Sequence, residues 1–395
     1  MSELALRHIE HLAVTIGPRG TCTPGERQAS EYCRQVLRDL GYEVHVQNFR
    51  ARRSGWAPYS IGSGLMSLCL LGFLLLPPAV GGPLTALLAT CVTLSAFLHL
   101  AFRPNLLAWL VPAGSSQNVY AIAPARSEPK RTIVVVGHVD THRTPVAMAS
   151  PLAFRLFRWL TTLGVISLVA LSVLFILGAI WPDPLWRQMT LPPGVIAGVV
   201  FVVTLQPEWS RYVPGANDNA SGAAAALALA ARLKAQPLLN TQVWLLNSGA
   251  EEVEATGPVR LLHKHPELTD ADWLVLDTIA GPGAGPCLIT VEHLLLPLRA
   301  DPNLLRLARS AAAARPDLGV YEHYFRGLYS EHSPLTVAGC RSLAVINFTP
   351  EGVLPNWHRP TDTFANIDPQ VFDRTEQFVW ELLQHLDRKA GEVHG

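Results

Sequence analysis

The sequence lacks three features that would each narrow its function. Its 31 Lys and Arg residues balance 31 Asp and Glu residues, so bulk charge gives no reason to expect a nucleic-acid partner. Its six cysteines show no CxxC or other metal-type spacing, so neither a cysteine zinc site nor a disulfide framework is expected. No GxSxG motif occurs, which argues against a serine hydrolase with a nucleophile elbow.

Charged side chains are also scarce, at only 16% of residues, and the mean hydropathy is +0.23. The apolar excess is concentrated in residues 58–112 and 152–206. This distribution is typical of membrane segments inserted into an otherwise soluble chain. Residues 1–50 contain no apolar run of the kind that forms the core of a signal peptide, so no cleaved signal peptide is expected.

Four uncharged segments are each about long enough to cross a bilayer core of roughly 30 Å. They pair as two hairpins, Tyr59–Pro78 with Pro83–Phe102 and Trp159–Trp181 with Met189–Gln206. The last segment is only just long enough, but an even number of crossings is needed if His138 and Asp218 share one site. The alternative is that these segments are helices buried in a large soluble core.

The hairpins divide the soluble chain into three pieces. We expect transmembrane hairpins at 57–112 and 151–206, and one discontinuous domain built from 1–56, 113–150 and 207–395. Arginines gather on the soluble-domain side of the spans, and the opposite loops carry only Arg187. By the positive-inside rule this predicts a cytoplasmic domain. The arginines concerned are Arg50, Arg52, Arg53, Arg103, Arg143, Arg155, Arg158 and Arg211.

The soluble pieces alternate between helical and strand patterns. Helices are expected at 3–16, 25–41, 221–235, 255–265, 302–314 and 369–389, and strands at 42–49, 117–124, 131–137, 242–247, 273–277, 287–292 and 342–348. This alternation predicts an α/β fold, a mixed and mostly parallel sheet sandwiched by helices.

Acidic and imidazole side chains follow several of the apolar strands. In an open α/β sheet the ligand site lies outside the carboxyl ends of the strands, so we expect these side chains to meet there. A further carboxylate lies in the turn Gly-Ala-Asn-Asp-Asn-Ala-Ser-Gly, where Asn219 or Ser221 would cap the next helix. The set is His138, Asp140, Asp218, Glu251, Glu252, Asp277, His358 and Asp362. Taken singly, each segment has an ordinary explanation as a polar turn or helix start.

Two histidines with several carboxylates form a ligand set that zinc accepts. Two ions about 3.5–4 Å apart need one bridging carboxylate, which we assign to Asp218. His138 and Asp277 then complete one ion. Glu252 and His358 complete the other.

Three nearby side chains have no ligand role in this scheme. Glu251 is left free as the general base. Asp140 is expected to accept the proton on the second ring nitrogen of His138, and Asp362 to support the loop of His358. His142 lies near the site in sequence and is expected only to line it.

The order HxD, GANDNASG, EE, LDxxxG and HxxxDT resembles the M28 family of zinc-dependent peptidases over roughly residues 1–50 and 115–390. The resemblance implies a zinc-exopeptidase fold with two zinc ions per chain. It matches His138, Asp218, Glu252, Asp277 and His358 to ligands, Glu251 to the catalytic base and Asp140 to the residue behind the first histidine. Two departures affect the substrate side: Val253 and Glu254 follow the glutamate pair, and Ser330-Glu331-His332 replaces Ser-Asp-His.

The resemblance implies hydrolysis of peptide bonds by a metal-bridging hydroxide, with an aminopeptidase favoured. The hairpins, which are not part of the usual family domain, would anchor the enzyme in a membrane. The alternatives are a carboxypeptidase, a deacylase, a glutaminyl cyclase, or a catalytically inactive membrane scaffold. The expected partners are a peptide substrate and the lipid bilayer. The expected location is a bacterial inner membrane, crossed by four helices, with the catalytic domain in the cytoplasm.

Overall fold

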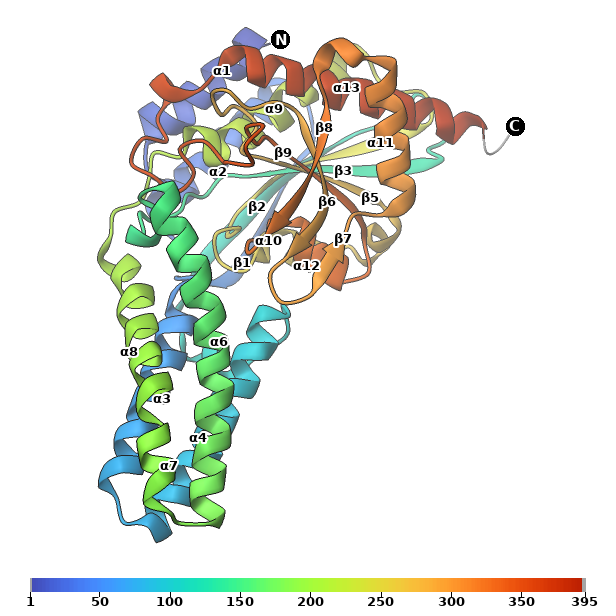
Figure 1. Ribbon diagram of the computed structural model, residues 1–395. Helices are drawn as coiled ribbons and strands as arrows, with labels where there is room; N and C mark the ends of the chain where they lie inside the picture. Colours follow the sequence, from blue (N-terminus) through green and yellow to red (C-terminus); the bar gives the residue numbers. More distant parts are fainter. Residues whose placement is uncertain (1, 393–395) are drawn as a thin grey trace. The chain divides into compact units, whose positions relative to one another are not determined.

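The computed structural model describes residues 2–392 (Figure 1). The chain forms two compact units, between which it passes at four points. The α/β unit contains the residues up to Arg53, Ala113–Arg143 and the residues from Tyr212 onward. The helical unit contains Ser54–Pro112 and Thr144–Arg211.

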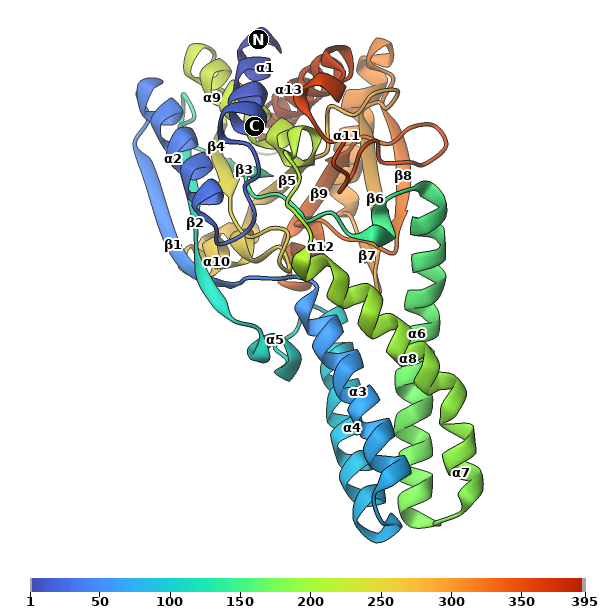
Figure 2. The same ribbon diagram turned by 90° about the vertical axis from the view of Figure 1, so that its left-hand side faces the viewer.

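The α/β unit is built on a nine-stranded sheet with the order β1-β2-β4-β3-β5-β9-β6-β7, in which β8 pairs with β6 (Figure 2). Its centre is parallel and consists of β4 (Thr241–Ser248), β3 (Arg131–His138), β5 (Asp272–Asp277) and β9 (Arg341–Ile346). These strands are apolar and buried, as parallel strands covered on both faces must be.

The flanking strands make the sheet mixed. On one side β1 (Val44–Arg52) pairs antiparallel with β2 (Ala113–Ala123), so the strands before and after the first apolar block belong to one sheet. The other flank contains β6 (Cys287–His293), β7 (Pro297–Arg299) and β8 (Tyr321–Arg326). The sequence analysis missed β7 and β8, because β7 is three residues long and begins with proline, and β8 is polar and partly exposed.

Helices cover both faces of the sheet. Along β3, Ile133 and Val135 point to one hydrophobic core while Val134 and Val136 point to the other, as the alternation of a strand requires. The first core contains residues of α1 (Ser2–Glu10), α2 (Pro24–Asp39), α9 (Ser221–Ala235), α11 (Pro302–Ala314) and α13 (Pro369–Glu392), and the second those of α10 (Thr256–Lys264) and α12 (His332–Val337). The predicted α/β sandwich is therefore confirmed.

The helical unit contains four helices that are long and apolar enough to cross a membrane. The helical unit is built from α3 (Ala57–Leu75), α4 (Pro78–Leu100), the short α5 (Leu106–Leu110), α6 (Pro151–Ile180), α7 (Pro184–Met189) and α8 (Leu191–Leu205). The third of the four long helices, α6, begins earlier than the sequence analysis expected, because the Ser150 side chain caps it by accepting a hydrogen bond from the Ala153 amide. The fourth combines α7 and α8 over Pro184–Trp209.

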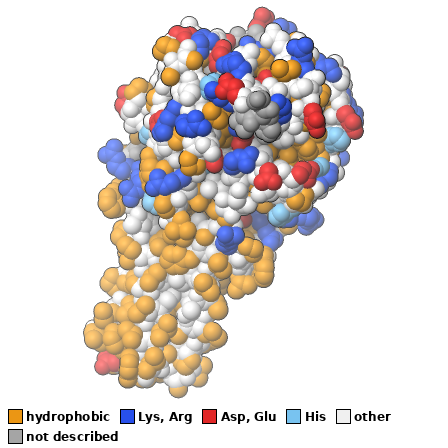
Figure 3. Space-filling view, turned by 90° about the vertical axis from the view of Figure 1, so that its right-hand side faces the viewer, with side chains coloured by type: hydrophobic (Ala, Val, Ile, Leu, Met, Phe, Trp, Pro, Cys, Tyr) orange, Lys and Arg blue, Asp and Glu red, His pale blue; other side chains and the backbone are white. Residues whose placement is uncertain are grey.

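Apolar side chains cover the outside of these helices, as Figure 3 shows for one face. Leu75, Leu87 and Val195 are each more than 60% exposed. A helix buried in a soluble core would hide such side chains, whereas lipid tails would cover them. Between the helices, large side chains such as Phe73 and Phe175 form a core. Small and hydroxylated residues allow close contacts beside it: Gly82 packs on Ala179, and the hydroxyls of Thr93 and Ser172 lie 2.8 Å apart.

Candidate metal centre

Two of the expected ligands end neighbouring parallel strands. His138 is the last residue of β3, and Asp277 is the last residue of β5. The chain places β4 on one side of β3 and then β5 on the other, so β3 lies where the strand order reverses. Such a reversal opens a crevice at the carboxyl ends of the strands, where ligands bind in folds of this type.

A tightly turning segment before α9 carries Asp218. Gly215 adopts a left-handed conformation with φ +63°, and a Cβ on Gly222 would lie 2.1 Å from the carbonyl oxygen of Leu276. Only glycine permits both the turn and the close approach. The residue in the N-cap position of α9 is Ala220, and neither Asn219 nor Ser221 occupies it. Asn219 lies just before it: its Oδ1 accepts a hydrogen bond from the Gly222 amide at 2.8 Å, and its side-chain amide donates to the carbonyl of Leu276.

Asp218 faces both histidines. Its Oδ1 lies 3.3 Å from Nε2 of His138, and its Oδ2 lies 3.1 Å from Nε2 of His358. Asp277 Oδ1 lies 3.8 Å from the His138 nitrogen, and Glu252 Oε2 lies 3.6 Å from the His358 nitrogen. The structure thus brings all five expected ligands together. The carboxylate of Asp218 lies between the pair His138 and Asp277 and the pair His358 and Glu252.

The donor atoms of this cluster fit divalent cations. Among the described residues, four buried atoms that belong to the side chains of this cluster have no hydrogen-bond partner: His138 Nε2, Asp218 Oδ2, Glu252 Oε1 and Asp277 Oδ1. Buried polar atoms are normally paired, so unpaired atoms that converge need an explanation. A bound ion would supply it, because nitrogen and carboxylate donors of this kind are ligands that zinc accepts.

The electrostatics of the cluster lead to the same conclusion. Burial, reinforced by neighbouring carboxylates, raises the pKa of Glu251, Glu252 and Asp277. Burial would also raise the pKa of Asp218, but His138 and His358 outweigh it and lower that pKa. Several carboxylates that resist ionising together can all be anionic once a divalent cation lies among them.

Asp140 acts through different atoms than the sequence analysis expected. Nδ1 of His138 donates to the backbone carbonyl of Asp140 at 3.1 Å, while the nearest carboxylate oxygen lies 3.5 Å away. The carboxylate is occupied by the hydroxyl of Thr21 and by the amides of Glu251 and Glu252. Its main role is therefore to hold the turn that carries the glutamate pair.

Asp362 also differs from expectation. Its carboxylate accepts hydrogen bonds from the backbone amides of Asn217 at 2.7 Å and Asp218 at 3.0 Å. It therefore positions the segment of Asp218 rather than the loop of His358. Burial and the nearby charge of Asp218 raise the pKa of Asp362 to about 7.

Arg19 is a fully buried residue of the site that the sequence analysis missed. Its guanidinium donates to five backbone carbonyls, those of Leu12, Gly17, Val139, Pro214 and Gly215, at 2.7–2.9 Å. Val139 follows His138, and Gly215 precedes Asp218, so one side chain joins the two ligand segments. No local pattern distinguishes this arginine, because its acceptors are backbone atoms of distant segments.

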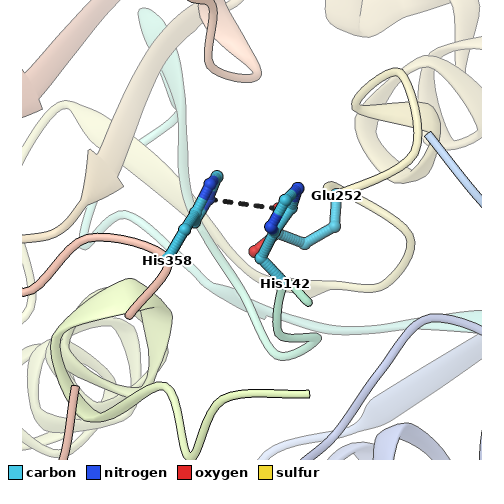
Figure 4. Close-up of side chains that lie close together, drawn as sticks. All are labelled: His142, Glu252 and His358. Carbon is cyan, nitrogen blue, oxygen red and sulfur yellow. Dashed lines mark ion pairs between the residues drawn. The ribbon is translucent and has the colours of Figure 1, made fainter. Parts of the chain in front are cut away.

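Two further acidic or imidazole groups adjoin the cluster. Glu331 is fully buried and accepts a hydrogen bond from Ser248 at the end of β4, and burial raises its pKa to about 7. His142 lies with its ring against that of His358 and its Nε2 3.9 Å from Glu252 (Figure 4). The sequence analysis expected His142 only to line the site.

Comparison with known proteins identifies the domain. Residues 200–383 match the model of peptidase family M28. This segment is similar to an M28 peptidase domain. The match covers the segments that carry Asp218, the glutamate pair, Asp277 and His358. No curated protein matches the sequence significantly.

Several solved structures share the fold of this chain. A leucine aminopeptidase precursor from Bacteroides thetaiotaomicron is 13% identical, with a TM-score of 0.58 and 97% of each chain covered. A zinc aminopeptidase from Bacillus subtilis is 17% identical, with a TM-score of 0.56, covering 97% of this chain and 94% of its own. A glutaminyl cyclase from Bacteroides thetaiotaomicron is 14% identical, with a TM-score of 0.57 and 97% of each chain covered.

Proposed function

We propose that this chain is a membrane-anchored di-zinc peptidase that removes residues from the amino terminus of peptides. The observation that supports this most directly is the position of Asp218, whose two carboxylate oxygens face two different histidines at 3.3 and 3.1 Å. A carboxylate in that position can bridge two ions.

The residues divide into two ligand sets around that carboxylate. His138 and Asp277 would hold one ion with Asp218, and His358 and Glu252 would hold the other. Zinc bound there would polarise the carbonyl of a peptide and would lower the pKa of water, so that water can lose a proton and attack that carbonyl. The role of the five side chains would therefore be to bind the two ions and, through them, to orient the scissile bond.

Glu251 is the residue that would move the proton. Its carboxylate lies within the cluster, with Oε2 3.7 Å from Nε2 of His138, and its amide is held by Asp140. Burial raises its pKa, which suits a group that takes a proton from the attacking water. The same carboxyl then delivers that proton to the departing amine nitrogen, which cannot leave as an anion.

The two ligand sets favour a peptidase over a glutaminyl cyclase. A cyclase of this group is expected to work with one zinc ion and to release ammonia, whereas this chain retains the ligands for two. A scaffold without activity would have no reason to keep every ligand and Glu251. Among peptidases, the aminopeptidases with the same fold favour action at the amino terminus.

Product analysis tests this proposal. Full-length protein in detergent is incubated with a panel of aminoacyl anilides and with peptides that begin with glutamine, with and without a chelator. We expect release of the amino-terminal residue that stops with the chelator and returns with Zn²⁺. Release of pyroglutamate and ammonia in place of a free amino acid would support a glutaminyl cyclase. Cleavage at the carboxyl terminus of the peptide would support a carboxypeptidase.

We further propose that the α/β unit lies in the cytoplasm. At the ends of the four spans that lead into this unit, Arg53 precedes the first span, Arg103 follows the second and Arg211 follows the fourth. Arg155 and Arg158 lie near the start of the third span, and Arg187 is the arginine near the opposite end, at the start of the fourth. Green fluorescent protein fused after the last residue should fluoresce in a bacterial host, while an alkaline phosphatase fusion at the same point should be inactive. An active phosphatase fusion would reverse this assignment.

A further inference from the structure

The imidazole of His358 lies between two aromatic rings. Its ring centroid is 3.6 Å from that of His142 at an interplanar angle of 6°, and 3.8 Å from that of Trp357 at 27°. Two rings cannot stack this closely on one face of an imidazole, so they lie on opposite faces. Figure 4 shows the His142 side of this arrangement, with the two imidazoles face to face beside Glu252.

His358 lacks the hydrogen bond that usually orients a metal-binding histidine. Such a histidine normally donates its second N–H to a carbonyl or carboxylate, which sets the direction of the ring. His138 does so, because its Nδ1 donates to the Asp140 carbonyl at 3.1 Å. Nδ1 of His358 is buried, and no hydrogen-bond partner for it occurs among residues 2–392.

His142 has the chemistry of a metal ligand but not the orientation. Its Nδ1 donates to the Arg143 carbonyl at 2.8 Å, so the lone pair is on Nε2. One donor atom from each of His142, Glu252 and His358 lies within 4.8 Å of the other two. An imidazole lone pair lies in the plane of its ring. Two parallel rings stacked face to face cannot direct both lone pairs at one ion about 2.0–2.1 Å from each nitrogen.

We propose that His142 and Trp357 form an aromatic clamp that holds the ring of His358 toward Asp218 in place of the missing hydrogen bond. His142 is then a positioning residue and not a sixth ligand. This inference rests on the proposed metal site. The clamp also explains why His142 is buried although it contributes no donor atom to either ligand set.

Metal titration of variants separates the clamp from ligation. Full-length protein in detergent is stripped with a chelator, and Zn²⁺ affinity is measured by competition with an indicator dye. His142→Phe keeps an aromatic face and removes the nitrogen, while His142→Ala removes both. His263→Ala, on the exposed face of α10, is the matched control.

We expect His142→Ala and Trp357→Ala each to lower the Zn²⁺ affinity of one of the two metal positions by about 10- to 100-fold, as the loss of a residue that orients a ligand does. His142→Phe should remain within about threefold of the wild type, and Co²⁺ bound to it should show the wild-type absorption spectrum. Circular dichroism identifies any variant that fails to fold.

Three results would overturn the inference. If His142→Phe binds as weakly as His142→Ala, with a changed Co²⁺ spectrum, the nitrogen is a ligand. If the alanine variants bind like the wild type, His358 needs no clamp while the proposed function stands. A wild-type protein that binds no Zn²⁺ overturns the proposed function, and the clamp with it.

Discussion

Glu251→Gln is expected to lower kcat by about 10²- to 10⁴-fold while leaving the metal content unchanged. The glutamine amide fills the same volume but cannot accept a proton from the attacking water or deliver one to the departing amine. Glu251 is not needed as a ligand, because His138, Asp277, Glu252 and His358 already form two sets around Asp218. Steady-state kinetics and elemental analysis of the same sample measure both quantities.

Glu267→Gln is the control for the loss of one negative charge, because its side chain is 65% exposed and lies outside the site. The control should behave like the wild type in both assays. Turnover of Glu251→Gln within a few-fold of the wild type would remove Glu251 as the base. Loss of metal from Glu251→Gln would make it a ligand instead.

Asp218→Ala is expected to abolish binding of both ions, with each affinity falling by more than about 100-fold. Asp218 directs one carboxylate oxygen at each of the two histidines, so its removal leaves each ion with fewer protein donors. Zn²⁺ should then raise the unfolding temperature of the wild type but not of the variant. A ligand present at 100 times its Kd stabilises the folded state by about 2.7 kcal/mol.

Asp218→Asn provides the matched comparison, because it keeps the shape of the side chain and removes its charge. We expect it to lose at least one ion, since an amide offers a single weak oxygen donor where a bridge needs two. Calorimetric titration and thermal unfolding with and without Zn²⁺ measure the effect. An Asp218→Ala protein that retains two ions would contradict the bridging assignment.

The sequence predicted the parts of the fold that depend on regular patterns. Uncharged runs identified the four apolar helices, a β-branched run identified β3, and short apolar runs identified β4 and β5. A ligand that ends a strand, such as His138 or Asp277, could be predicted because parallel strands meet at one edge of the sheet. β7 and β8 carry no such pattern and depend on pairing with β6.

The supporting contacts of the site could not be predicted in the same way. Spacing suggested that Asp140 and Asp362 support the histidines, but their carboxylates bind backbone amides of the two other ligand segments. Which atoms a carboxylate meets depends on the turns of loops that fold against each other. Arg19 and the ring contacts of His358 likewise join segments that are far apart in the sequence.

The most direct test of this account is the zinc content of full-length wild-type protein purified in detergent, measured per chain by elemental analysis. The account predicts about two ions, both removed by a chelator and both recovered on adding Zn²⁺. One ion would contradict the bridged pair and support the cyclase alternative. A protein that contains no zinc would contradict the account as a whole, and the ligand residues would then be inherited features of the fold without a metal-binding role.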